Sequence, residues 1–314
     1  MARLLILGGS GFIGSNLIDK LLLMNFDVVG IDNFDNYYSR NIKESNLFFA
    51  YKHNNFKLIE LDIRNKKDFE KIDGNFDFII HLAAKAGVRP SLENPNDYIS
   101  VNVLGTLNVI EFAKIKGVKN IIFASSSSVY GNNNNLPWHE NDLDLKPISP
   151  YATSKISGEL LGKTYSHIDG LNFTSLRFFT VYGPRQRPDL AINSFFSKIM
   201  NNEPITVFGD GSSIRDYTYV SDIVNGICNL IQTNLIGYNV FNFGSSNPIK
   251  LKDMIKAIEN IVQKKAILNY SINQIGDAPK TFSDSSKAFI EVGFKSEIDF
   301  NLGISLYFKW LNEK

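Results

Sequence analysis

Short apolar runs alternate with longer stretches of helical periodicity over about the first 180 residues of the chain. This alternation is typical of successive βαβ units, in which helices connect the strands of a parallel sheet. The pattern predicts one helix over residues 12–23 and another from about 92 to 116, where Gly117 supplies the residue type favoured just beyond a helix. Strands are predicted over residues 3–7, 27–31, 57–61, 76–81, 120–125 and 173–178.

The pattern changes after Tyr182, where prolines interrupt the alternation and shorter elements follow. We therefore expect two parts of the α/β class. Residues 1–182 are predicted to form a Rossmann-type, doubly wound parallel sheet, and residues 183–314 a smaller lobe that mainly binds substrate. A final amphipathic pattern predicts a helix over residues 302–311, while the asparagine run at 132–135 is interpreted as a surface loop.

Composition narrows the classes of protein that the sequence can encode. With 314 residues, 44% hydrophobic and 21% charged, the chain is long enough for a large core and is unlike a disordered or fibrous protein. A formal net charge of +1 gives no overall field for nucleic acid or an anionic membrane. Cys228 is the only cysteine, and no apolar run approaches the roughly 20 residues that span a bilayer. We expect a cytoplasmic protein without membrane or nucleic-acid partners.

Three glycines, Gly8, Gly11 and Gly14, follow the first predicted strand and open the first helix. Glycines there let the backbone approach a pyrophosphate, whose charge the helix N-terminus stabilises. Asp32 ends the second strand, where a carboxylate can bind the adenosine ribose hydroxyls and would repel a 2′-phosphate. Because no arginine follows until Arg40, the sequence predicts NAD rather than NADP. The alternative is a structural turn beside a surface aspartate.

A tyrosine and a lysine four residues apart, Tyr151 and Lys155, stand at the start of a helical stretch that follows Pro150. This spacing places both side chains on one helix face. About one such pair is expected by chance in a chain of this composition, so a surface tyrosine beside a surface lysine is the alternative. The position of the pair in the chain favours a catalytic site. The pair follows four serines, residues 125–128, at the sheet edge where open α/β sheets bind ligands.

Taken together, these motifs resemble the extended short-chain dehydrogenase/reductase family, in its nucleotide-sugar epimerase branch. The resemblance covers nearly the whole chain, more weakly after about residue 245. It is carried by Gly8-x-x-Gly11-x-x-Gly14, Asp32-Asn33, Asp62-Ile63, His81-Leu82-Ala83-Ala84, Ser125-Ser126-Ser127-Ser128-Val129-Tyr130-Gly131, Tyr151-x-x-x-Lys155 and Arg215-Asp216. Within the branch, the chain is most similar to UDP-glucuronate 4-epimerases through Ala86-Gly87-Val88-Arg89, the four serines before Val129-Tyr130-Gly131, and Phe179-Thr180-Val181-Tyr182-Gly183-Pro184. The resemblance also implies a homodimer packed through two helices of the first lobe.

The chemistry of the predicted catalytic residues agrees with that resemblance. A lysine ammonium and the positive nicotinamide ring both favour the phenolate of Tyr151, so its pKa is expected to fall from about 10 toward the working range. Tyr151 would take the proton from a sugar hydroxyl as hydride passes to NAD, while Ser126 bonds the same oxygen and Lys155 holds the nicotinamide ribose. Return of the hydride to the opposite face of the keto sugar inverts one carbon and regenerates NAD.

The resemblance also implies which residues bind the two ligands; no metal ligands are assigned. The diphosphate of a UDP-sugar is expected at Arg215, the uridine ribose at Asp277, and the uracil near Val207 and Phe208, with Arg89 as a further substrate contact. The cofactor is expected at Gly8, Gly11, Phe12, Ile13, Gly14, Asp32, Asn33, Asp62, Ile63, Leu82, Ala83, Ala84, Asn102, Tyr151 and Lys155.

The predicted sugar pair is UDP-glucuronate and UDP-galacturonate. Arg187 matches the position where glucuronate epimerases hold the C6 carboxylate, with Ser127 and Thr180 as neutral donors beside it. UDP-N-acetylglucosamine or UDP-glucose is the alternative, since Thr281 stands where glucose epimerases carry a bulky tyrosine. In many of those enzymes an arginine stands at the position of Gln274.

Two other functions are disfavoured by the residues around the serine cluster. A 4,6-dehydratase would carry an acid directly after the catalytic serine or threonine, and this chain has Ser127 and Ser128 there. A protein that keeps NAD only as a structural or sensing ligand would not need Ser126, Tyr151 and Lys155 together.

Overall fold

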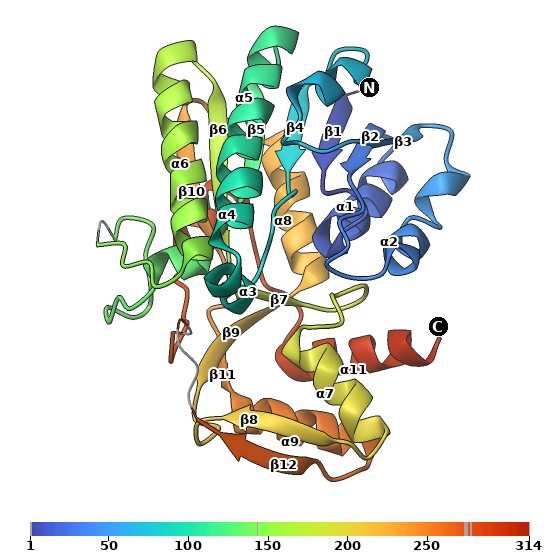
Figure 1. Ribbon diagram of the computed structural model, residues 1–314, viewed down its shortest axis with the longest axis vertical. Coiled ribbons are helices and arrows are strands. Elements are labelled where there is room, and N and C mark those ends of the chain that lie inside the picture. The colour runs from blue at the N-terminus through green and yellow to red at the C-terminus, as the bar shows by residue number, and fades with distance from the viewer. Residues whose placement is uncertain (1, 143, 273–275, 277, 314) are drawn as a thin grey trace.

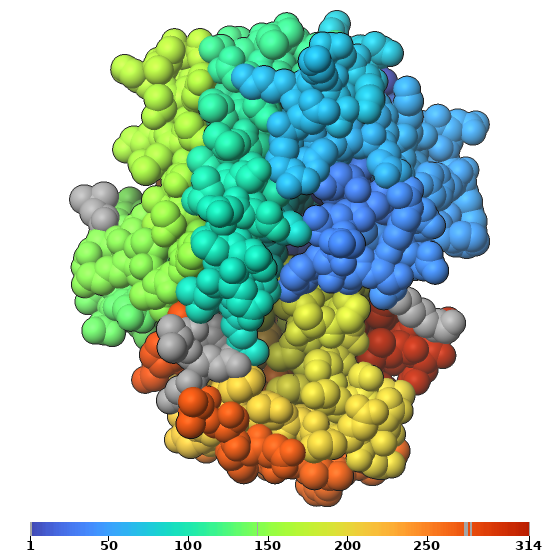
Figure 2. Space-filling view, in the orientation of Figure 1, coloured from blue at the N-terminus to red at the C-terminus, as the bar shows by residue number. Residues whose placement is uncertain are grey.

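Two lobes lie one above the other in the computed structural model, which describes residues 2–142, 144–272, 276 and 278–313 (Figure 1). The upper lobe is a parallel sheet with helices on both faces, and the lower lobe contains shorter strands and helices. In the space-filling view the yellow and red chain of the lower lobe meets the blue and teal chain of the upper lobe along a seam across the middle of the molecule (Figure 2). Among the described residues, no helix is long and apolar enough to cross a membrane.

The upper lobe is built on a seven-stranded, wholly parallel sheet, which confirms the predicted fold class. From β1 the chain proceeds to β2 and β3 on one side and to β4, β5 and β6 on the other, so the strand order reverses at β1. Such a reversal opens a crevice at the carboxyl ends of the strands. The order is β10-β6-β5-β4-β1-β2-β3, with bounds β1 Arg3–Leu7, β2 Asp27–Asp32, β3 Phe56–Glu60, β4 Phe78–His81, β5 Asn120–Ser126, β6 Asn172–Phe178 and β10 Tyr238–Phe243.

Helices cover both faces of this sheet, which explains why its strands read as continuous apolar runs. Leu4 and Ile6 of β1 pack in one apolar cluster and Leu5 and Leu7 in the other, because successive side chains of a strand point to opposite faces. One face is covered by α1 (Phe12–Leu23), α8 (Val220–Gln232) and α10 (Ser286–Val292), with α2 (Arg40–Asn46) beside α1 at the edge of the sheet; the other face is covered by α5 (Gly105–Lys116) and α6 (Pro150–Asp169).

The stretch predicted as one helix from 92 to 116 is divided into four pieces. These are α3 (Val88–Glu93), α4 (Pro95–Tyr98), the π-helical η3 (Ile99–Leu104) and α5. Asn94 leaves the helical conformation, with φ −130° and ψ 62°, and Pro95 lacks the N–H that would continue α3. Gly117 ends α5 in the left-handed conformation with φ 69°, as predicted. The remaining short helices are the 3-10 segments η1 (Ala50–Lys52), η2 (Lys66–Lys71) and η4 (Ser127–Tyr130).

The lower lobe packs three helices against two small sheets around an aromatic core that includes Phe196, Tyr219 and Tyr307. The predicted C-terminal helix is confirmed with slightly wider bounds, and Asp299 caps it by accepting a hydrogen bond from Leu302 N. The elements are β7 (Thr180–Tyr182), β9 (Ile214–Tyr219) and β11 (Pro248–Lys250) in one sheet, β8 (Pro204–Phe208) and β12 (Ile267–Ser271) in the other, and the helices α7 (Ala191–Met200), α9 (Leu251–Val262) and α11 (Phe300–Asn312).

The chain passes between the lobes more than once after residue 182. Strand β10 returns to pair with β6 at the edge of the large sheet, and α8 packs against α1 beneath that sheet. Residues from the second half of the sequence therefore complete the upper lobe. The division at 182/183 stays a prediction about which part of the chain binds the cofactor and which part binds the substrate.

Candidate active site

A cleft of about 550 Å³ lies between the lobes at the carboxyl ends of the parallel strands. The end of β1, the loops after β2 and β4, the start of α6 and the segment after β6 all contribute to its walls. The predicted residues that line it are Gly8, Gly11, Phe12, Ile13, Gly14, Asp32, Asn33, Asp62, Ile63, Leu82, Ala83, Ala84, Ser126, Ser127, Tyr151, Lys155, Thr180, Arg187 and Arg215.

The three motif glycines let β1, α1 and the loop after β4 come together. A Cβ atom on Gly14 would lie 2.2 Å from the carbonyl oxygen of Gly8, and one on Gly8, whose φ is +81°, would lie 2.8 Å from Ala83 N. Helix α1 begins after Gly11, which offers no side-chain cap, and no acidic residue lies in its first turn. The N–H groups and the positive end of this helix suit a pyrophosphate, so the residues present fit a dinucleotide.

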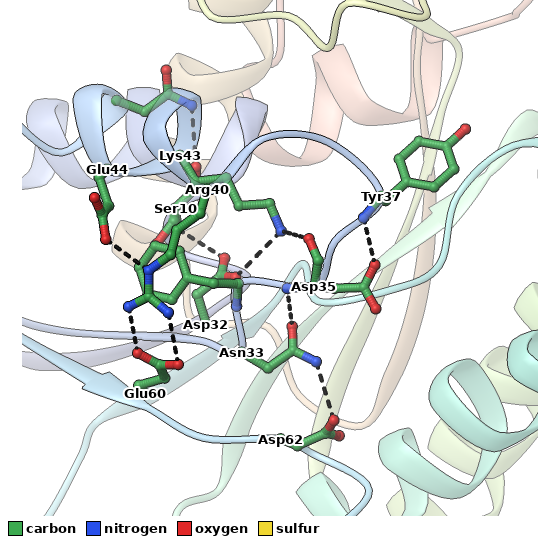
Figure 3. Close-up of polar contacts among 12 residues, drawn as sticks. Ser10, Asp32, Asn33, Asp35, Tyr37, Arg40, Lys43, Glu44, Glu60 and Asp62 are labelled. Carbon is green, nitrogen blue, oxygen red and sulfur yellow. Dashed lines mark hydrogen bonds and ion pairs between the residues drawn. The ribbon is translucent and has the colours of Figure 1, made fainter.

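Asp32 ends β2 on the cleft wall and is buried, but it does have a cationic neighbour (Figure 3). Its carboxylate accepts hydrogen bonds from Ser10 N at 3.1 Å and Phe34 N at 2.9 Å, and Lys43 Nζ lies 3.8 Å away. Burial raises the pKa of Asp32, and Lys43 opposes that rise. The prediction of NAD assumed that Asp32 lacks a neighbouring cation, and this assumption is wrong, because α2 carries Lys43 back over the end of β2.

Other charges around Asp32 are paired with one another. Arg40 donates to both oxygens of Glu60 and also to Glu44, which directs its guanidinium away from Asp32 (Figure 3). Asn33 donates to Asp62 across the cleft edge. Burial alone would raise the pKa of Asp62, but hydrogen bonds, above all from Arg64, lower it to about 2. The cofactor end of the cleft thus has carboxyl groups at the ends of two neighbouring strands, and the lowered pKa of Asp62 keeps that group ionised at neutral pH.

Tyr151 and Lys155 both lie in the first two turns of α6, as the spacing predicted. Lys155 Nζ donates to Ala124 O at 2.6 Å and lies 5.9 Å from the Tyr151 ring centre. Burial lowers the pKa of Lys155 to about 7, so this amine is only partly charged at neutral pH. Burial raises the pKa of Tyr151, and the groups that oppose this are Ser126, through a hydrogen bond, and Arg187, through its charge. The pKa of Tyr151 was expected to fall, but in the structure it is raised, because burial outweighs the groups that oppose it.

The N-terminal cap of α6 fixes the backbone from which both side chains project. Ser149 Oγ accepts a hydrogen bond from Ala152 N at 3.1 Å, and Pro150 occupies the first helical position. We expect Ser149→Ala to lower the free energy of unfolding by about 0.5–2 kcal/mol in urea titrations, because one helix N–H loses its partner.

Ser305→Ala serves as the control for this cap. It removes a hydroxyl that bonds Asn301 O on the exposed face of α11, so the helix loses no cap and stability should change little. Equal effects of the two substitutions would contradict a capping role for Ser149.

A buried polar network that the motifs did not reveal lies behind the serine cluster. Glu159 and Arg177 form a two-pronged ion pair at 2.8 and 3.0 Å, and both side chains are almost fully buried. Ser125 donates to Glu159, and Arg177 donates to the Tyr130 hydroxyl, which in turn donates to Asn242 of β10. The network joins α6, β5, β6 and β10, and it holds the end of β5 where Ser126 enters the cleft.

Asn102, predicted as a cofactor contact, does not line the cleft. Its amide accepts from Lys85 N at 2.8 Å, donates to Lys85 O at 2.9 Å, and donates to the Ser154 hydroxyl of α6. It therefore ties the loop after β4 to the helix that bears Tyr151. Lys85 itself lines the cleft and pairs with Asp35 of the loop after β2 at 3.0 Å.

On the sugar side, Arg187 and Thr180 line the cleft from the segment after β6. Arg187 makes a two-pronged pair with Asp189, at 2.9 Å from Nε and 2.8 Å from Nη2. Arg215 lines the cleft from β9, where its Nη1 donates to Ile214 O and Pro279 O. Thr281 is also on the lining, and its hydroxyl accepts a hydrogen bond from Asp216 N.

Neither of the predicted uracil contacts, Val207 and Phe208, is among the described residues that line the cleft. Val207 is buried in the core of the lower lobe with Ile205, because alternate residues of β8 face inward, and this corrects its placement at the cleft. Phe208 lies beneath the Arg89 guanidinium, 4.5 Å from ring centre to Cζ, where the two lobes meet. Neither Arg89 nor Phe208 is among the residues that line the cleft. Asp277 and Gln274 fall outside the described residues.

Known proteins resemble this chain over its whole length. A model of the NAD dependent epimerase/dehydratase family matches residues 4–244. Protein CapI of Staphylococcus aureus is 38% identical over 330 residues, covering 99% of this chain and 98% of CapI. UDP-glucuronate 4-epimerase of Thermodesulfobacterium geofontis is 39% identical over 316 residues, covering 100% and 97%. A crystal structure of UDP-glucuronic acid 4-epimerase from Bacillus cereus, in complex with UDP-glucuronic acid and NAD, matches with a TM-score of 0.92 at 33% identity and 99% coverage of each chain.

Proposed function

The chain belongs to the NAD dependent epimerase/dehydratase family, and from this membership we propose that it catalyses NAD-dependent 4-epimerisation of a UDP-hexose, with UDP-glucuronate and UDP-galacturonate as the interconverted pair. One observation carries the proposal. A single cleft has a glycine cradle and Asp32 at one end, and Tyr151, Ser126 and Arg187 together at the other.

Each of these residues has a role in the proposed reaction. Tyr151 takes the proton from the sugar hydroxyl and later returns it, and Ser126 holds the same oxygen by a hydrogen bond. Lys155, which also lines the cleft, would hold the nicotinamide ribose by a hydrogen bond. NAD, when bound, accepts a hydride from the sugar carbon and gives it back, so the cycle has no net oxidation. Arg187 holds the sugar carboxylate and, by its charge, lowers the pKa of Tyr151 against the rise caused by burial.

The arrangement around Ser126 favours epimerisation over dehydration. Ser127 and Ser128 continue into the short helix η4, and Ser128 N donates to Ser126 Oγ at 3.1 Å. The acids on the described cleft lining are Asp32, Asp35 and Asp62, which lie at or just beyond the ends of β2 and β3, the cofactor end. Among the described residues, no lining carboxylate therefore stands where a proton next to a keto group would be removed.

A neutral sugar is the second candidate, and Thr281 is the observation that favours it. Its short side chain lines the cleft and leaves room for a larger 2-substituent, as in UDP-N-acetylglucosamine. A panel of UDP-sugars tests both candidates: interconversion of UDP-glucuronate with UDP-galacturonate supports the proposal, and preference for UDP-N-acetylglucosamine or UDP-glucose contradicts it. Transient NADH absorbance during turnover distinguishes chemistry from NAD binding without catalysis, and its absence with every sugar would contradict an enzyme.

The cofactor is NAD, and Asp32 is proposed to select it through the ribose hydroxyls. We expect denatured wild-type protein to release mainly NAD. Asp32→Ala should retain NAD about 10-fold more weakly, the order expected for the loss of hydrogen bonds to a charged group.

Asp27→Ala is the matched control for that experiment. Asp27 begins the same strand at its far end and pairs with Arg3 on the surface, so its loss should leave cofactor retention unchanged. Recovery of mainly NADP from the wild type, or full retention in Asp32→Ala, would contradict this role of Asp32.

We also propose that the protein forms a homodimer and that it acts in the cytoplasm. Helices α5 and α6 lie side by side on one face of the upper lobe, and Ile115, Leu160 and Ile168 on them are more than half exposed (Figure 1). A second copy of this face would cover these side chains. The single cysteine, Cys228, which is buried, supports a reducing compartment.

A further inference from the structure

Arg187 is held by a partner that the sequence motifs did not single out. Asp189, two residues along, receives hydrogen bonds from Nε at 2.9 Å and from Nη2 at 2.8 Å. This bidentate contact through Nε and Nη2 fixes the plane of the guanidinium. The Arg187 side chain is 19% exposed and lines the cleft, whereas Asp189 is 42% exposed and is not on the lining, so the aspartate stands behind the arginine.

A third residue joins the pair from the cofactor side of the cleft. The Tyr37 hydroxyl donates to Asp189 Oδ2 at 3.2 Å, and the Tyr37 ring lies 5.2 Å from the Arg187 guanidinium carbon. Tyr37 belongs to the loop after β2, where its backbone N–H bonds Asp35, the partner of Lys85. The contact between Tyr37 and Asp189 spans 152 residues of sequence and connects the loop after Asp32 with the segment that bears Arg187.

From this geometry we propose that Asp189, supported by Tyr37, is the positioning residue that turns Arg187 toward the C6 carboxylate and so sets the preference for a uronate over a neutral sugar. The inference rests on the proposed function, because it assigns a role within the same sugar site. Asp189 does not touch the sugar in this scheme; it acts only through Arg187.

Some N–H donors of Arg187 are not used by Asp189. Asp189 can therefore position the arginine without competing with the substrate for it. A guanidinium has five N–H groups in a rigid fork, and contact through Nε and Nη2 leaves the two donors of Nη1 outside the pair with Asp189. A sugar carboxylate can therefore bind at Nη1 while Asp189 stays in place. Arg187 and Tyr151 line the same cleft, and the charge of Arg187 lowers the pKa of Tyr151.

The test compares the kcat/KM for UDP-glucuronate with that for UDP-glucose in wild-type enzyme and in Asp189→Asn. The amide removes the charge and one of the two acceptors, so we expect the uronate-to-neutral ratio to fall about 10-fold, the order of one charge-assisted hydrogen bond. The change should lie mainly in KM for the uronate, because Asp189→Asn leaves the charge of Arg187 in place and alters only how the carboxylate is held. Asp189→Glu should recover part of the ratio, and Tyr37→Phe should lower it by less than Asp189→Asn.

Asp144→Asn is the matched control, since Asp144 and Lys146 form an exposed ion pair of the same spacing outside the cleft. Thermal melts and NAD content of each variant show whether the fold and the cofactor site are intact. A ratio that is unchanged or raised in folded Asp189→Asn would overturn the positioning role while leaving the proposed function standing. Wild-type enzyme that shows no preference for the uronate would overturn both.

Discussion

Replacing Tyr151 with phenylalanine is expected to lower kcat by about 10²- to 10⁴-fold, the loss typical when a general acid–base is removed. The hydroxyl is the only group lost, and it is the atom proposed to move the proton of the sugar. The ring keeps its edge contact with Tyr98, 6.1 Å between ring centres, so the fold and the UDP-sugar affinity should survive. Steady-state kinetics and calorimetric titration of UDP-glucuronate measure the two quantities separately.

Tyr165→Phe is the control for this substitution, because Tyr165 lies on the same helix and its ring is covered by Lys114 of α5 rather than by the cleft. It should leave kcat within about 2-fold of wild type, since surface changes away from a site have small effects. A Tyr151→Phe enzyme with near-wild-type kcat would remove the proposed mechanism. Loss of activity in both variants would point instead to damage of α6.

The local patterns predicted most of the upper lobe because its strands are buried on both faces. Strand β1 has the predicted bounds, and the predicted bounds of β2 to β6 differ by no more than two residues at either end, since a continuous apolar run is visible without knowledge of its neighbours. Strand β10 was missed. Its sequence, Tyr238–Phe243, mixes asparagines with aromatic residues, and its partner β6 lies about 65 residues earlier. Only the assembled sheet gives Asn242 its buried partners, Tyr130 and the backbone of Trp138.

The residues of the candidate site likewise fall into those that a local sequence pattern reveals and those that it does not. Gly8, Gly14 and Tyr151 could be found from the sequence because their spacing follows from a single turn or helix. Lys43, Glu159 and Asp189 could not be found from the sequence, because the role of each depends on a tertiary contact.

The assignment of the sugar carboxylate to Arg187 predicts strong discrimination in the wild-type enzyme. Arg187 keeps its pair with Asp189, but a site built around a carboxylate leaves its Nη1 donors without their acceptor when a neutral hexose binds. That loss costs more than one methylene, which changes kcat/KM by roughly 10- to 200-fold. We therefore expect the ratio of kcat/KM for UDP-glucuronate to that for UDP-glucose to exceed about 200 in the wild type. Arg187→Met keeps much of the apolar stem and removes the charge, so this ratio should fall to about 10 or below.

Arg185→Met provides the matched comparison, because Arg185 stands two residues away but pairs with Asp19 of α1 and does not line the cleft. Its loss should leave the uronate preference unchanged, even if stability falls. The loss of Arg187 should also reduce kcat for both sugars, because its charge opposes the burial that raises the pKa of Tyr151. A drop in kcat with no change in the uronate-to-neutral ratio would mean that Arg187 serves the tyrosine alone. The open space beside Thr281 would then be the better guide to the sugar.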